Sequence, residues 1–210
     1  MTLVALAAAW LALSRFRAEP AWWTASNPAD PRVVRNAEEV EGAAMAQLTA
    51  VRSDQASWSV SLQQMDACDW LSARLPVWLR SQGRSMPSEV RAVRVAFATE
   101  GVYVGAKIEG MGGRVVWVLV QPRVDERGLW LPASRAGVGR AEVPLATALS
   151  AAALPRELAS SPDAVGVLAI LKGEAPAMSR PETQVDSSRR VRLESLTSGH
   201  GVLEVGARTE

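Results

Sequence analysis

Two spacings of apolar residues divide the chain. Over residues 32–53 the apolar positions recur every three or four residues with few helix breakers, which predicts an amphipathic helix. From residue 93 onward, short segments alternate apolar and polar side chains with a period of two, which predicts β-strands. The chain is therefore expected to fold as an α+β protein whose longer helices precede most of its strands.

A second helix, rich in tryptophan, is predicted over residues 61–82. Ser61 is followed three residues later by Gln64, a capping-box pattern in which side chains satisfy the unpaired amide groups of a helix start. Pro76 lacks an amide hydrogen and clashes with the preceding turn, so we expect the helix to kink or restart near Ala73. Its apolar stripe consists of Leu62, Met65, Leu71, Leu75, Trp78 and Leu79.

The strand pattern predicts one sheet. Residues 93–108 are expected to form a hairpin, and residues 114–124 a third strand. This strand is apolar on both faces from Val115 to Val120, which predicts that the sheet is covered on both sides there. An irregular strand, two short helices, a loop and a closing hairpin are then predicted over residues 129–143, 144–154, 162–171, 173–188 and 189–209. The expected architecture is two helices packed on a curved antiparallel sheet, with short helices inserted before a C-terminal hairpin.

The amino terminus carries a short apolar segment. Residues 2–14 have no charged side chain, and at ~1.5 Å per residue they would cover roughly 20 Å of a hydrocarbon core about 30 Å thick. No A-x-A cleavage pattern follows, and four residues have the character of a membrane boundary. These membrane-interface candidates are Arg15, Arg17, Trp22 and Trp23. We interpret the segment as a retained anchor, with a cleaved signal peptide or a core helix as alternatives.

This interpretation sets the domain boundaries. Residues 1–21 are predicted to be the anchor, and residues 22–31, which include the sequence NPADP, a linker. Residues 32–210 would form one α+β domain, held outside the cytoplasm by a single pass through the inner membrane.

Composition narrows the function classes. The 210 residues include 23 basic and 22 acidic side chains, a net charge of +1, so the whole chain has no basic excess for nucleic acid. One cysteine, Cys68, permits no internal disulfide and no cysteine-based zinc site. His200 is the single histidine and falls in a predicted turn. No nucleophile, base and orienting group can be assembled, so we expect no enzyme, no cofactor and no metal.

Several segments carry a family resemblance. They include AEEVE, the lone Trp58, DWLSARLPVWL, MPSEVRAVRVAF, GVYVGAKIEG, VVWVLVQPRVDERGLWL and the closing RVRLESL and GHGVLEVGART. In this layout the chain resembles membrane-anchored proteins of planctomycete-type bacteria and is similar to the YpmS-like group, which is related to the TULIP-like lipid-binding fold. The resemblance implies a long helix laid against a curved antiparallel sheet, with a groove between them that could accept an acyl chain.

The functional hypothesis follows from this groove, because a site for an apolar ligand needs concave, largely hydrophobic walls. We expect an extracytoplasmic module that binds lipid or another apolar molecule between helix 61–82 and the sheet. The alternative is a protein-interaction or scaffold module of the cell envelope, in which the same tryptophans serve core packing. The candidate groove residues are Trp70, Leu71, Leu75, Trp78, Leu79, Tyr103, Trp117 and Trp130.

Overall fold

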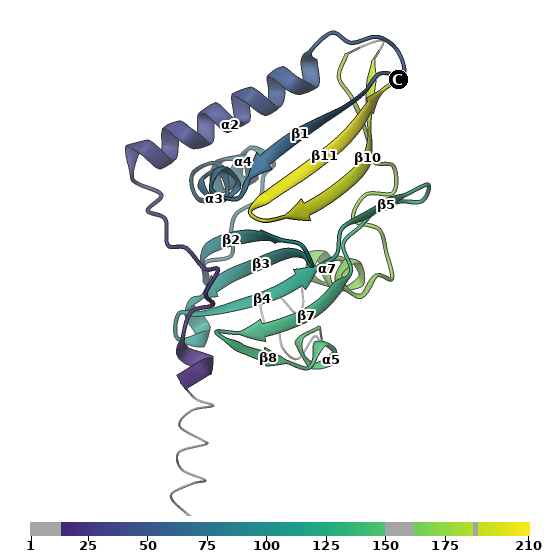
Figure 1. The fold of residues 1–210 in the computed structure, drawn as a ribbon. Coiled ribbons are helices and arrows are strands. Elements are labelled where there is room, and N and C mark those ends of the chain that lie inside the picture. Colours follow the sequence, from purple (N-terminus) through teal and green to yellow (C-terminus); the bar gives the residue numbers. More distant parts are fainter. Residues whose placement is uncertain (1–13, 150–161, 187–188) are drawn as a thin grey trace, which may run out of the picture.

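A computed structural model describes residues 14–149, 162–186 and 189–210 of the chain (Figure 1). The fold is α+β, as predicted, but its strands form three antiparallel sheets where one curved sheet was expected. Residues 14–17 are helical, and the helices that follow them are α2 (Pro31–Thr49), α3 (Gln64–Ala73), α4 (Leu75–Ser81), the 3-10 turn η1 (Glu109–Met111), α5 (Leu145–Ala148) and α7 (Pro162–Lys172).

Two larger sheets and one hairpin organise the strands. The central sheet has the order β2-β3-β4-β7-β8, and its strands are Val90–Ala98, Gly101–Ile108, Arg114–Val120, Ala133–Val138 and Ala141–Val143. The C-terminal sheet has the order β1-β11-β10-β9, and its strands are Ser57–Gln63, Val202–Thr209, Arg190–Gly199 and Glu182–Gln184. The small hairpin pairs β5 (Arg123–Asp125) with β6 (Gly128–Trp130).

The first predicted helix is confirmed as α2. Asp30 caps its start, because the Asp30 carboxylate accepts a hydrogen bond from the Arg32 amide at 2.9 Å. Pro31 occupies the first turn, where the missing amide hydrogen costs nothing. The helix ends at Thr49, four residues before the predicted end.

The predicted helix 61–82 is corrected at its start and confirmed at its break. Residues up to Gln63 belong to strand β1, in which serines alternate with apolar side chains, so the capping-box interpretation of Ser61 was wrong. The Gln64 side chain instead accepts a hydrogen bond from the Phe97 amide of β2. The break falls at Arg74, between α3 and α4, where Pro76 in the first turn of α4 excludes a continuous helix.

The central sheet is covered on both faces, as the apolar strand Val115–Val120 predicted. On one face, α3 and the C-terminal sheet close a core around Ala67, Phe97, Val102 and Val120. On the other face, Trp23 packs with Val115, Trp117 and Leu119. Strand β4 therefore contributes to two separate cores.

The amino-terminal segment forms the second cover. Trp22 and Trp23 lie over Gly105, where an added Cβ would come within 2.7 Å of the Trp22 ring. The Trp117 ring covers Gly137 in the same way, and a Cβ added to Gly137 would lie only 2.3 Å from that ring. Gly105 and Gly137, which flank Trp117 on its two neighbouring strands, thus leave the room that three indole rings fill.

Polar contacts fasten this segment to the central sheet. The buried Arg94 guanidinium donates to the carbonyl oxygens of Thr24 and Ser26 at 3.1 Å each. Lys107 pairs with Glu19 at 2.8 Å. The predicted linker 22–31 is therefore held to the sheet over its first half.

These contacts change the interpretation of the membrane-interface candidates. Trp23 is buried in the core and Trp22 packs edge-on against it, so the structure uses both indoles for packing. The Arg15 carbonyl oxygen accepts a hydrogen bond from the Arg140 amide at the β7–β8 turn, and Arg17 lies two residues before Glu19 in the same segment. Most of the predicted anchor lies outside the described residues. Within the described ranges no helix has the length and apolar character needed to cross a membrane.

Two smaller predictions are also corrected. The strand predicted over 114–124 is interrupted at Gln121 and Pro122, and its last residues pair in the small hairpin instead. The loop predicted over 173–188 contains the short strand β9, which adds a fourth strand to the C-terminal sheet.

Candidate apolar binding site

The C-terminal sheet has one apolar and one polar face. Trp58, Val60 and Leu62 of β1 are paired with Ala207, Val205 and Leu203 of β11, and β10 adds Val191 and Leu193 to the same face. The intervening residues of β1 are Ser57, Ser59, Ser61 and Gln63, and all four are exposed. The period-2 alternation therefore directs one row of apolar side chains inward.

Only one end of this apolar face is closed by the central sheet. Leu62 and Leu203 pack against the core around Phe97 and Val102. Toward Trp58 the same face borders a cavity of about 390 Å³, which Leu62 also lines. The cavity thus begins where the core between the two sheets ends.

Helix α2 forms one wall of the cavity through Ala44, Gln47 and Leu48. Figure 1 shows α2 running alongside β1, with its C-terminal end near the chain terminus. The opposite wall comes from Leu129 of β6 together with Met178 and Pro181. The lining is aliphatic and aromatic except for a few groups at the rim, which is the chemistry that an apolar chain requires.

Helix α2 is fastened at its first half by α3. The Arg74 guanidinium pairs with Glu41 at 2.7 Å, and the Trp70 indole donates to the same carboxylate at 3.3 Å. The hydrogen bond from Arg74 holds the pKa of Glu41 below its usual range. Asn36 donates to Asp66 and Asp69 of α3 at 3.2 and 2.8 Å.

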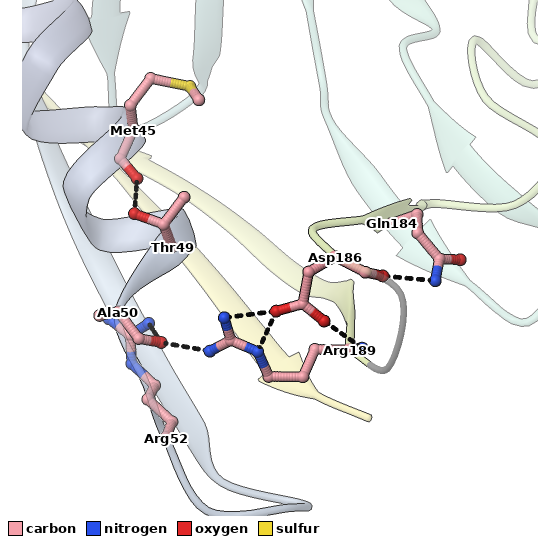
Figure 2. A network of polar contacts seen from close by, with 7 residues as sticks. All are labelled: Met45, Thr49, Ala50, Arg52, Gln184, Asp186 and Arg189. Atoms are coloured by element: carbon pink, nitrogen blue, oxygen red, sulfur yellow. Dashed lines mark hydrogen bonds and ion pairs between the residues drawn. The ribbon is translucent and has the colours of Figure 1, made fainter.

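A second set of contacts holds the far end of α2 (Figure 2). The Arg189 guanidinium donates to the Ala50 carbonyl oxygen at 3.3 Å, and it pairs with Asp186. This contact joins the C-cap of α2 to the segment between β9 and β10. Helix α2 is therefore fixed on both sides of the three residues that line the cavity.

Arg52 lies at the same end, directly after α2. Its guanidinium carbon is 4.0 Å from the centre of the Trp58 ring, a cation–π contact. Its Nη2 donates to the Gln47 side-chain oxygen at 2.8 Å. The Trp58 indole N–H donates to the Thr209 hydroxyl at 3.3 Å, so the polar edge of the ring is satisfied while its face lines the cavity.

The opposite wall is positioned by the small hairpin. The Leu129 amide donates to the Met178 carbonyl oxygen at 2.9 Å, which joins β6 to the segment before β9. Asp125 receives the Trp130 indole N–H at 2.9 Å, and this bond lowers the pKa of the carboxyl group. Trp130 is buried and stabilises the hairpin, while the neighbouring Leu129 reaches the cavity.

The predicted groove residues do not converge on one surface. Trp70 lies between α2 and α3, where it donates to Glu41. Leu71, Leu75 and Leu79 are half-buried, and Trp78 of α4 is 50% exposed. None of these residues is among those that line the cavity described above.

The remaining three predicted groove residues lie at two other places in the fold. Tyr103 and Trp117 lie under the amino-terminal segment, where their rings meet at 5.6 Å. The Trp117 indole donates to the Gly139 carbonyl oxygen at 2.9 Å. Trp130 belongs to the small hairpin, so the three rings line no common groove.

The sequence contained a signal for the cavity that the capping-box interpretation of Ser61 obscured. The stretch SWSVSLQ, residues 57–63, alternates strictly, and this predicts a half-buried strand. Together with the alternating closing hairpin, which the structure confirms as β10–β11, it marks the apolar face. The contributions of α2, Leu129 and Met178 depend on contacts between distant segments, which no local pattern encodes.

Other reactive side chains have structural contacts. The Cys68 thiol is buried, donates to the Val95 carbonyl oxygen at 3.3 Å, and has its pKa raised by that burial. His200 occupies the β10–β11 turn with a φ of 42°. Among the residues that the structure describes, no group of three histidine, cysteine, aspartate or glutamate side chains is placed to hold a metal ion.

Comparisons with known proteins complete the description of the site. Family models, curated proteins and solved structures yielded no match to this chain.

Proposed function

We propose that this protein binds the hydrocarbon chain of a lipid or similar amphiphile in the cavity between α2 and the C-terminal sheet. The observation that carries the proposal is a 390 Å³ space with an almost wholly apolar lining. It is bordered by the apolar face of the C-terminal sheet, which the central sheet covers only at the Leu62 end. The site differs from the one predicted, because α2 rather than helix 61–82 supplies its helical wall.

The volume suits one chain. Pockets for small ligands have volumes of roughly 300–1,000 Å³, and at about 30 Å³ per water-sized group this cavity holds on the order of ten methylene groups. Each buried methylene contributes roughly 0.8 kcal/mol, so such a chain supplies about 8 kcal/mol against the cost of association. Reversible binding of a single chain is the expected outcome.

The cellular setting belongs to the same proposal. An apolar amino-terminal segment that is retained would hold the module at the outer face of the inner membrane, beside a source of lipid. The layout resemblance to TULIP-like proteins supports the same class of ligand. The fastening of residues 19–26 to the central sheet would keep the domain close to that membrane.

A second candidate function has one observation in its favour. Helix α4 exposes Trp78 by 50% and Val77 by 40%, and exposed aromatic side chains are enriched at protein interfaces. On this hypothesis α4 contacts an envelope protein. Trp78→Ala would then weaken capture of that partner and leave the affinity for an apolar chain unchanged.

The test of the principal proposal fills the cavity. Ala44 is exposed on α2 and lines the space, so Ala44→Phe places a ring inside it without disturbing a core. Ala43→Phe adds the same ring to the same helix at an exposed position outside the lining. Titration calorimetry with decan-1-ol should show saturable binding to the wild type and to Ala43→Phe, and at least about tenfold weaker binding to Ala44→Phe. Equal affinity in all three proteins would contradict the proposed site.

A further inference from the structure

We propose that the ligand is a single-chain carboxylic acid whose carboxylate is bound by Arg52. The inference rests on the proposed function, because it assigns the head group of a molecule whose chain occupies the cavity. It would make the site selective for fatty acids over neutral chains of equal length.

Arg52 does not line the cavity itself, but it contacts two residues that do, Trp58 and Gln47. Its guanidinium lies over the Trp58 ring at 4.0 Å and donates to the Gln47 amide oxygen at 2.8 Å. Stacking on an aromatic ring leaves the edges of a guanidinium available for hydrogen bonds in its plane. A head group at the Trp58 end of the cavity would meet those edges.

Arg52 also has unused binding capacity. A guanidinium has five N–H donors, and its Nη1 and Nη2 atoms donate to the backbone oxygens of Gln47 and Ala50 and to the Gln47 side chain. Within residues 14–149, 162–186 and 189–210, no carboxylate forms an ion pair with Arg52. A carboxylate that replaced the neutral Gln47 amide would form shorter, charge-assisted bonds.

The surrounding charges favour this position over others at the rim. Arg189, the other arginine at the end of α2, already pairs with Asp186. Glu182 contributes to the rim of the cavity. It is paired with Arg192, which is paired with Arg208, so the Glu182 side chain lies with these two arginines on the polar face of the sheet. Of the two arginines at the end of α2, Arg52 is therefore the one whose positive charge an acidic head group would neutralise.

The test compares two probes of equal chain length on the full chain in detergent-free buffer. Decanoate and decan-1-ol are titrated into the wild type, Arg52→Gln and Arg190→Gln. Arg190→Gln is the matched control, because it changes the net charge by the same amount. Arg190 is exposed on the polar face of β10 and does not line the cavity. We expect decanoate to bind the wild type and Arg190→Gln about tenfold more tightly than decan-1-ol, and Arg52→Gln with no such preference.

The results separate the two proposals. Binding of decan-1-ol to the wild type without a preference for decanoate overturns this inference alone, and so does a preference that persists in Arg52→Gln. Absence of binding by both probes overturns the proposed function instead. A measurement without any variant checks the same point: in the wild type, the preference for decanoate should fall as salt is raised from about 50 to 500 mM, because the added ions screen the Arg52 charge. A preference unchanged by salt contradicts the inference.

Discussion

The two larger sheets bury their apolar faces to different degrees. In the central sheet, Val115 is 1% exposed, and side chains fill the space on both sides of its strand. In the C-terminal sheet, Trp58 and Val60 belong to a similarly apolar row, yet they are only half-buried beside a cavity. An apolar face that the chain leaves unfilled is the part of the molecule available to a ligand.

The difference has a local cause. On the central sheet, Gly105 and Gly137 have no side chains, so indole rings can approach the backbone there. On the C-terminal sheet, α2 is held by polar contacts on both sides of its cavity-lining residues, at Glu41 through Arg74 and at Ala50 through Arg189. The central sheet is therefore the more completely packed of the two, and the C-terminal sheet borders the proposed site.

The largest expected effect tests the packing of the central sheet. Trp117→Ala removes a buried ring and its bond to Gly139, and should lower the free energy of unfolding by about 3–5 kcal/mol. Trp78→Ala removes the same side chain from the exposed helix α4 and should cost less than about 1 kcal/mol. Urea denaturation measures both, and similar losses would contradict the contrast between buried and exposed tryptophans.

A smaller loss is expected where the amino-terminal segment crosses the sheet. Gly105→Ala would place a Cβ 2.7 Å from the Trp22 ring, so the segment must shift, at a cost of about 1–3 kcal/mol. Gly110→Ala is the control, because nothing lies within 4 Å of its added Cβ. Protease cleavage near Trp22 should accelerate in Gly105→Ala alone; equal cleavage in both variants would show that the segment is not packed there.

The two apolar rows can be compared with one type of substitution. Val115→Ala empties space in a filled core and should cost about 1.5–2 kcal/mol. Val60→Ala enlarges a space that already exists, and should cost under about 1 kcal/mol. Thermal unfolding of the two variants gives the order, and a larger loss for Val60→Ala would mean that the cavity is filled in solution.

The smallest effect concerns the wall of the cavity and depends on pH. Because Arg74 lowers the folded-state pKa of Glu41, the contribution of this pair is fully present above the ordinary value of 4.5 and is lost as pH falls through the lower folded value. Protection of the α2 amides from hydrogen exchange, measured relative to the intrinsic rate at each pH, should therefore fall below about pH 4.5. Glu41→Gln should show lower protection already at neutral pH, and protection independent of pH in the wild type would exclude the pair as a fastening of α2.

The sequence predicted what depends on local spacing. It indicated α2, the break before Pro76, the two-sided burial of Val115–Val120 and the closing hairpin, because each follows from periodicity or from backbone chemistry. It placed the tryptophans in one groove, whereas the structure distributes them among α2–α3, the amino-terminal cover and the small hairpin. Packing between distant segments decides those positions. Ser61 likewise has a local capping pattern, but it pairs with β11 as part of a strand.

On the proposed function, an apolar chain binds the C-terminal sheet and leaves the central sheet unchanged. The most direct test is an NMR titration of the protein, with its valine and leucine methyl groups labelled, with decan-1-ol. We expect saturable shifts at Val60, Val191, Leu193 and Val205, which line the cavity, and none at Val115 or Leu119. Shifts confined to Leu75 and Leu79 beside α4, or no saturable shifts at all, would contradict it.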